Sequence, residues 1–243
     1  MTRHGRYRPR VPSPPASASV YPLRARGRVI GGSAVLAVIV YAYVLRIAVG
    51  DVNPFDFFGY FTNQTSALTA ALLIVLGLLA TRGRRVPPSL TVAWAVGVAC
   101  LIVVAVVYNG LVPGTGPAPP WVSIVLHAVF PVLVVVDFAT APDRPVLPWN
   151  RLWWVLPYPL LWVAVVLFRG ATDGWVPYGF LLPERGLASL VLHVVGILLL
   201  LLVAATGVWA FSRVRWAGRT PTRHPSERRV EGAERGIHPL RHV

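Results

Sequence analysis

A stripe of hydroxyl side chains opens the second long apolar segment of the chain. The segment begins Y-F-T-N-Q-T-S-A-L-T at residue 60, so Thr62, Thr65, Ser66 and Thr69 share one helical face at spacings i, i+3, i+4 and i+7. A strongly polar group inside a bilayer is costly unless it is paired. Such a stripe either lets helices pack closely or lines a functional site, and the stripe alone leaves both interpretations open.

Two histidines are expected at the depth of this stripe. His127 and His193 each lie six residues inside a later apolar segment, which places them about 9 Å from the segment ends at 1.5 Å per residue. Ser66 lies at a similar depth, and Tyr108 and Asn109 end a further segment on the same side. We expect these groups to form one polar layer. It could hold a polar ligand, and the imidazole pair could ligate haem.

Pro131 gives a local reason to examine His127. A proline inside a helix has no N–H for the carbonyl four residues earlier, which here belongs to His127. We therefore expect the helix to bend at this point and to leave the carbonyl without its helical donor.

Charged residues near this layer have two interpretations. Arg46, Arg169 and Arg185 could hold a carboxylate or phosphate group, or they could pair with acidic neighbours and reach lipid headgroups. Asp137, near the other end of its segment, is expected to pair with Arg144 or Arg151.

The elements that must position these residues are six apolar runs. Each is close to or above the roughly 20 residues that cross a bilayer as a helix. The runs cover residues 28–49, 60–80, 88–109, 121–141, 151–169 and 187–211. We predict an all-α, polytopic membrane protein with six transmembrane helices in a domain at 28–211. The Arg- and Pro-rich stretch 1–27 and the Arg-rich stretch 212–243 are predicted to be disordered tails.

The distribution of arginine predicts the orientation. With the N-terminus in the cytoplasm, 20 of the 23 basic residues lie on the cytoplasmic side and three lie outside. Both termini are therefore expected to be cytoplasmic, and the absence of Lys favours a bacterial plasma membrane. Anionic lipid headgroups account for the basic tails, so nucleic acid is not expected as a partner.

Composition also limits the chemistry. The single cysteine, Cys100, excludes an intrachain disulfide and a thiolate metal site, and we expect no metal or cofactor. The loop R-G-A-T-D-G-W-V-P-Y-G-F at residue 169 alternates aromatic residues with Gly and Pro. It predicts either an ordered aromatic cap over the outer face or ordinary interfacial anchoring.

Four segments resemble a family of six-span bacterial membrane proteins, the Pr6Pr family. They are Y-F-T-N-Q-T-S at 60–66, L-H-A-V-F-P-V-L-V-V-V-D-F at 126–138, W-V-L-P-Y-P-L at 154–160, and the loop at 169–180. Pr6Pr proteins are in turn distantly similar to the androgen-induced (FAR-17a-type) membrane proteins, threonine hydrolases that cleave fatty acid esters of hydroxy fatty acids. The resemblance implies a lipid or fatty-acid ester as substrate. This chain departs from relatives at Ser66, often Asn, and at Ser123, where they carry an acidic residue.

The resemblance implies Thr62 as nucleophile and His127 as its base. A threonine hydroxyl attacks an ester only when a nearby base takes its proton. Asn63, Thr65, Ser66, Asn109, His193 and Arg169 are the expected supporting or substrate-binding residues. Two alternatives stay open: binding or transport of a lipid or small amphiphile without chemistry, and a redox protein with haem between the two histidines.

Overall fold

The computed structural model describes residues 17–111, 118–142 and 144–214, with side chains from residue 22 onward. That part of the chain is helical and contains no strand. Most of the two predicted tails, residues 1–16 and 215–243, lies outside the described residues. The contacts below belong to the compact unit that ends at Arg213.

Eight α-helices and four 3-10 or π-helical segments follow one another in the described part of this unit. In chain order they are α1 (Ser17–Ala48), α2 (Pro54–Gly59), α3 (Phe61–Thr81), α4 (Pro88–Leu111), α5 (Pro120–Ile124), η1 (Val125–Val129), α6 (Phe130–Thr140), η2 (Trp149–Val155), α7 (Pro157–Thr172), η3 (Gly179–Leu181), η4 (Pro183–Arg185) and α8 (Gly186–Phe211). Several begin at a proline, which suits the first turn of a helix because its missing N–H has no partner there anyway.

Six of the helical segments are long and apolar enough to cross a membrane, which confirms the predicted class of multi-pass membrane protein. They are Pro22–Ala48, Phe61–Thr81, Pro88–Leu111, Pro120–Thr140, Trp149–Thr172 and Pro183–Phe211. Two differences from the predicted runs matter. α1 begins at Ser17 rather than at residue 28, and the fourth span is interrupted by the π-helical turn η1.

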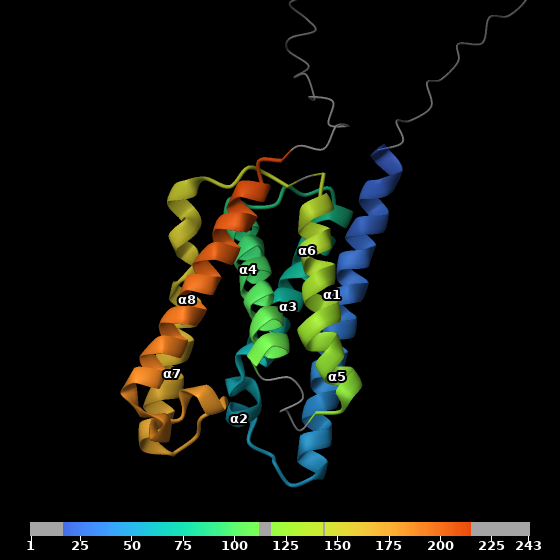
Figure 1. Cartoon of the computed structure of the whole chain (residues 1–243). Helices are drawn as coiled ribbons and strands as arrows, with labels where there is room; N and C mark the ends of the chain where they lie inside the picture. The colour runs from blue at the N-terminus through green and yellow to red at the C-terminus, as the bar shows by residue number, and fades with distance from the viewer. Residues whose placement is uncertain (1–16, 112–117, 143, 215–243) are drawn as a thin grey trace, which may run out of the picture. The chain divides into compact units, whose positions relative to one another are not determined.

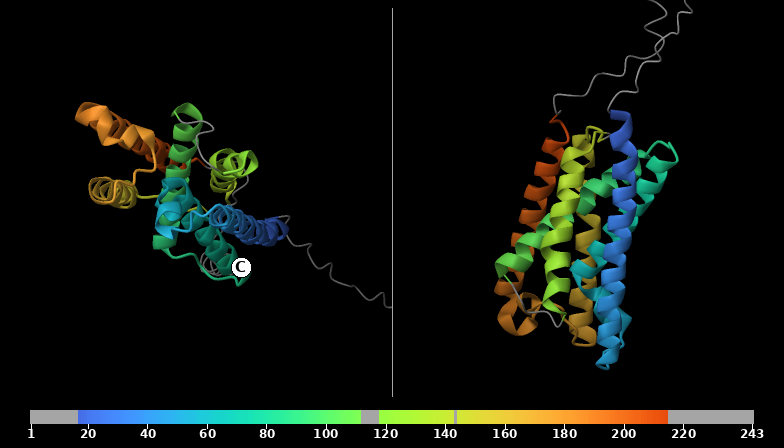
Figure 2. Two further views of the ribbon diagram at one scale, coloured as in Figure 1. Left: turned by 90° about the horizontal axis from the view of Figure 1, so that it is seen from below. Right: turned by 90° about the vertical axis from the view of Figure 1, so that its right-hand side faces the viewer.

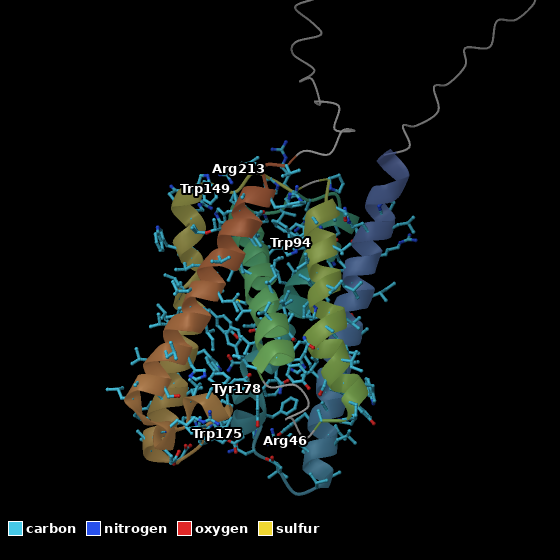
Figure 3. All side chains as sticks on the ribbon, viewed as in Figure 1. Arg46, Trp94, Trp149, Trp175, Tyr178 and Arg213 are labelled. Carbon is cyan, nitrogen blue, oxygen red and sulfur yellow. The ribbon has the colours of Figure 1, made fainter. Side chains whose placement is uncertain are left out.

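The helices pack around α4. It contacts α3, α6 and α8, while α1 packs most extensively on α3 (Figure 1). Seen along the helix axes, α7 and α8 lie on one side of α4, and α1 and α6 lie on the other (Figure 2). We call the end where α1 finishes and α3 begins the site end, and the opposite end the terminal end. Figure 3 shows Arg46, Trp175 and Tyr178 at the site end, and Trp149 and Arg213 at the terminal end.

Glycines let α1 and α3 approach closely. A Cβ on Gly32 would lie 2.5 Å from the carbonyl oxygen of Ala70, and one on Gly77 would lie 2.6 Å from that of Ala25. Both distances are shorter than an ordinary van der Waals contact, so a larger side chain at either position would push the two helices apart. This is the small-residue packing that joins helices in membranes, where no hydrophobic force drives them together.

Asp137 does not pair as the sequence predicted. It accepts hydrogen bonds from Arg28 at 2.8 Å and Arg24 at 3.1 Å, both on α1. Arg144 instead donates to the backbone carbonyls of Phe138 and Ala139 near the end of α6. The predicted partners were wrong because α1 begins earlier in the chain than expected, and its first turns bring Arg24 and Arg28 alongside α6.

Candidate active site

The hydroxyl stripe of α3 is buried as predicted, but its members have different surroundings. Thr62, Thr65, Ser66 and Thr69 are all buried inside the bundle. The Thr65 hydroxyl lies 3.0 Å from that of Tyr158 on α7. Ser66 is fully buried, and its hydroxyl has no hydrogen-bond partner among the described residues. Of the four, Thr62 lies nearest the start of the helix, and it borders two cavities.

Two cavities meet beside Thr62. The first, which we call the apolar chamber, has a volume of about 90 Å³ and lies between α4, α7, α8 and the loop before η3. The second, which we call the vestibule, has a volume of about 430 Å³ and lies between α1, α3, α5 and the same loop. Four residues line both cavities: Thr62, Tyr108, His127 and Tyr178. The fold therefore brings the predicted nucleophile and base to one boundary.

The His127 side chain has a defined tautomer. Its Nδ1 lies 2.9 Å from the backbone carbonyl oxygen of Ser123. A carbonyl can only accept, so Nδ1 carries the hydrogen, and Nε2 of the neutral ring keeps its lone pair. The ring also stacks on Tyr108, with 3.5 Å between centroids and 15° between planes. His127 is thus held on two sides, with Nε2 available as a hydrogen-bond acceptor or proton acceptor.

The backbone around His127 departs from the α-helix, as Pro131 led us to expect. Residues Val125–Val129 form a π-helical turn, a feature that often occurs at functional sites. Asn109, at the end of α4, donates its side-chain amide to the His127 carbonyl at 3.2 Å and to the Ala105 carbonyl at 2.7 Å. Asn109 therefore supports the turn that carries His127, and both bonds commit its amide to backbone carbonyls.

The aromatic loop before α8 covers the site end, and it adds a residue that was not among the predicted site residues. The Tyr178 ring lies 5.7 Å from Tyr60 and 5.8 Å from Trp162, and it stacks on Phe180 at 5.3 Å. Burial raises the pKa of Tyr178 to about 12, although hydrogen bonding from the side chain and backbone of Thr62 acts in the opposite direction. The alternating aromatic pattern had left a cap and interfacial anchoring open, and neither interpretation predicted that one ring borders the cavity beside Thr62.

Asn63 lies near the site but is already bonded. Its side-chain amide donates to the Phe57 carbonyl at 2.8 Å, and the residue lines the vestibule. Arg46, which also lines the vestibule, pairs with Asp51. Both residues therefore stabilise the segment between α1 and α3 as well as bordering the cavity.

His193 and Arg169 line neither of the two cavities. The Nδ1 atom of His193 donates to the Ser189 carbonyl at 2.7 Å. The His193 ring stacks on Phe180 with 5.5 Å between centroids. Arg169 bonds to Asp56 and Asp173, each at 2.7 Å, and lies 4.3 Å from the centre of the Trp175 ring. Arg169 thus joins α7 to α2 and to the loop that carries Trp175. Its role in the structure is to hold these elements together.

No family model, curated protein or solved structure matches the chain. At the site, one hydroxyl, one oriented imidazole and two phenols surround the boundary between an apolar and a more polar cavity.

Proposed function

We propose that the protein is an intramembrane hydrolase of lipid or fatty-acid esters, with Thr62 as nucleophile and His127 as general base. The observation that carries this proposal is that Thr62 and His127 line the same two cavities while the Ser123 carbonyl leaves Nε2 of His127 as the acceptor. The sequence resemblance to Pr6Pr proteins, and through them to threonine ester hydrolases, points to the same pair.

The bonds that form and break in this reaction involve the Thr62 hydroxyl, the His127 imidazole, the ester and water. The Thr62 hydroxyl attacks the ester carbonyl carbon while its proton passes to Nε2 of His127. Collapse of the tetrahedral intermediate breaks the bond to the alkoxy oxygen, which takes the proton from His127 and leaves as the alcohol. Water then attacks the acyl carbon while His127 takes its proton, and collapse of this second intermediate releases the acid and returns the proton to the Thr62 oxygen.

The cavities suit a substrate that comes from lipid. The walls of the apolar chamber are mostly aliphatic and aromatic side chains from α4, α7 and α8, which fit an acyl chain. The vestibule offers polar groups such as Arg46, Asn63 and Ser123 for the rest of the molecule. We further propose that the site end faces outward from a bacterial plasma membrane, since the arginine bias assigns the other end to the cytoplasm.

The direct test is covalent labelling of protein purified in detergent. The wild-type protein is expected to hydrolyse a long-chain ester and to react with an alkyl fluorophosphonate. Thr62→Ala should abolish both reactions, and Thr62→Ser should restore labelling because it keeps the hydroxyl. Thr69→Ala is the matched control, since that threonine lies on the same buried face of α3 but lines neither cavity.

Two outcomes would change the assignment. A wild-type protein that neither labels nor hydrolyses esters of any chain length is not this hydrolase. Labelling that survives Thr62→Ala but is lost in Thr65→Ala or Ser66→Ala would keep the enzyme and move the nucleophile.

The alternative is a protein that binds a lipid or small amphiphile without chemistry, and the predominantly apolar lining of the chamber favours it. Bound lipid would then be recovered with the purified protein by mass spectrometry, unchanged in structure and equally abundant in the wild type and in Thr62→Ala. Hydrolysis that depends on Thr62 excludes this alternative as the whole function.

A further inference from the structure

Thr62 and His127 do not by themselves complete an ester hydrolase. As the hydroxyl attacks, the carbonyl oxygen gains negative charge, and a hydrogen-bond donor aimed at it is usually the largest single contribution to catalysis. The two asparagine amides closest to the site each donate to backbone carbonyls. Asn63 donates to the Phe57 carbonyl, and Asn109 donates to two carbonyls. Neither amide lines both cavities, so a donor that does line both is better placed for a carbonyl oxygen at their boundary.

Tyr178 has the required position. It lines both the apolar chamber and the vestibule, as Thr62 and His127 do. Its ring is held by the rings of Tyr60, Trp162 and Phe180, with centroids between 5.3 and 5.8 Å away. A side chain packed on three sides cannot change rotamer without displacing its neighbours, so the phenol is fixed before substrate arrives.

The phenol is also held in its neutral form, in which it can donate. Burial raises the pKa of Tyr178, and hydrogen bonding from Thr62 and the Phe61 backbone, in the first turn of α3, only partly offsets that rise. A phenol can accept hydrogen bonds and at the same time donate its own hydrogen. With its pKa raised to about 12, Tyr178 stays protonated throughout the pH range in which His127 can act as a base.

We propose that Tyr178 is a third catalytic residue, which donates its phenolic hydrogen bond to the substrate carbonyl oxygen as Thr62 attacks. The inference rests on the proposed hydrolase. The electron pair of the carbonyl bond moves onto oxygen and accepts from Tyr178, while the Thr62 proton goes to Nε2 of His127. When the intermediate collapses, the pair returns, the alkoxy bond breaks and His127 protonates the leaving alcohol. Tyr178 keeps its proton throughout.

Steady-state hydrolysis by Tyr178→Phe tests the role. The substitution keeps the ring and removes the hydroxyl, so kcat is expected to fall about 100-fold or more, the usual effect of losing one such donor, with KM within about twofold. Tyr41→Phe is the matched control. Tyr41 packs against Trp121 with 5.4 Å between ring centroids and lines neither cavity, so kcat of this variant should equal that of the wild type.

A second measurement separates catalysis from packing. A long-chain trifluoromethyl ketone forms a tetrahedral adduct with a nucleophilic hydroxyl and places an oxyanion where the donor is needed, whereas the matching ether cannot. Tyr178→Phe should weaken binding of the ketone about 100-fold and leave binding of the ether unchanged. Equal loss for both ligands, or an unchanged kcat in Tyr178→Phe, would overturn the role of Tyr178 while leaving the hydrolase. A wild-type protein without esterase activity would overturn the proposed function itself, and the role of Tyr178 with it.

Discussion

The side-chain amide of Asn109 donates a hydrogen bond to the backbone carbonyl of His127, with 3.2 Å between nitrogen and oxygen. Pro131 lies four residues after His127 and has no N–H, so this carbonyl has no donor from the ordinary helical pattern. Asn109 supplies one from the end of α4. The kinked segment that carries His127 is thereby joined to the central helix of the bundle, at the point where the two cavities meet.

This relationship predicts an energetic coupling between Asn109 and Pro131. Asn109→Ala should lower the free energy of unfolding by about 1 kcal/mol, because the His127 carbonyl loses the donor that Asn109 supplies. In a Pro131→Ala background the restored backbone N–H should reduce that loss. Unfolding of the two single variants and the double variant in detergent measures the coupling. An identical cost in both backgrounds would show that the bond does not compensate for the proline.

The contact between Gly59 and Trp175 predicts that the loop can be displaced by one methyl group. A Cβ on Gly59 would lie 2.2 Å from the Trp175 ring, whereas one on Gly110 would have nothing within 4 Å. Gly59→Ala should move Trp175 and the loop that carries Tyr178, and a shift of about 1 Å in a site can reduce the rate 100-fold. Gly110→Ala should retain wild-type hydrolysis. Equal activity of the two variants would contradict a role for the loop in positioning the site.

The cluster around Asp137 predicts a large effect on stability. Asp137 faces Arg24 and Arg28, and the Arg28 side chain is only 4% exposed. Asp137→Asn should cost about 3 kcal/mol, because it removes the charge that balances a buried guanidinium. Asp51→Asn removes the partner of Arg46 at a site where the acidic side chain is 41% exposed, and should cost at most about 1 kcal/mol. Thermal unfolding of both variants in detergent would test this order, and a reversed order would contradict it.

The raised pKa of Tyr178 predicts that the folded protein loses stability at alkaline pH. Its pKa is raised to about 12 in the folded protein, compared with about 10 in an unfolded chain. The folded state therefore binds more protons between these values, and the stabilisation present below pH 10 is lost as the pH rises toward 12. Above pH 10 the melting temperature of the wild type should fall more steeply than that of Tyr178→Phe. Parallel slopes would show that the phenol is not held in its neutral form by the fold.

The proposed orientation can be tested with reporter fusions in the loops. Fusions at Phe55 and Tyr178 should report the outer face, and those at Arg84 and Pro145 should report the cytoplasm, because basic loops are retained on the cytoplasmic side. An outer signal at Arg84 would reverse the orientation and move the site to the cytoplasmic half of the membrane.

The amino-acid sequence by itself determined the class of fold and the buried face of α3. Apolar runs of about 20 residues can cross a bilayer only as helices, because no water is present to satisfy the backbone. The positions of the six spans thus follow from composition alone. Thr62, Thr65, Ser66 and Thr69 share a face because helical periodicity is local, and the structure buries all four.

Only the tertiary structure decided which of these polar groups meet. The Thr65 hydroxyl lies within hydrogen-bond distance of Tyr158. Asp137 pairs with two arginines of α1 and not with Arg144 or Arg151, which are closer to it in sequence. His193, at the depth predicted for His127, stacks on Phe180 and lines neither cavity. Depth in the membrane can be counted along one helix, but the direction of a side chain depends on how the helices rotate and pack against one another. Contacts between helices therefore depend on the tertiary structure. Tyr178 lies at the site because the loop that carries it folds back over the start of α3.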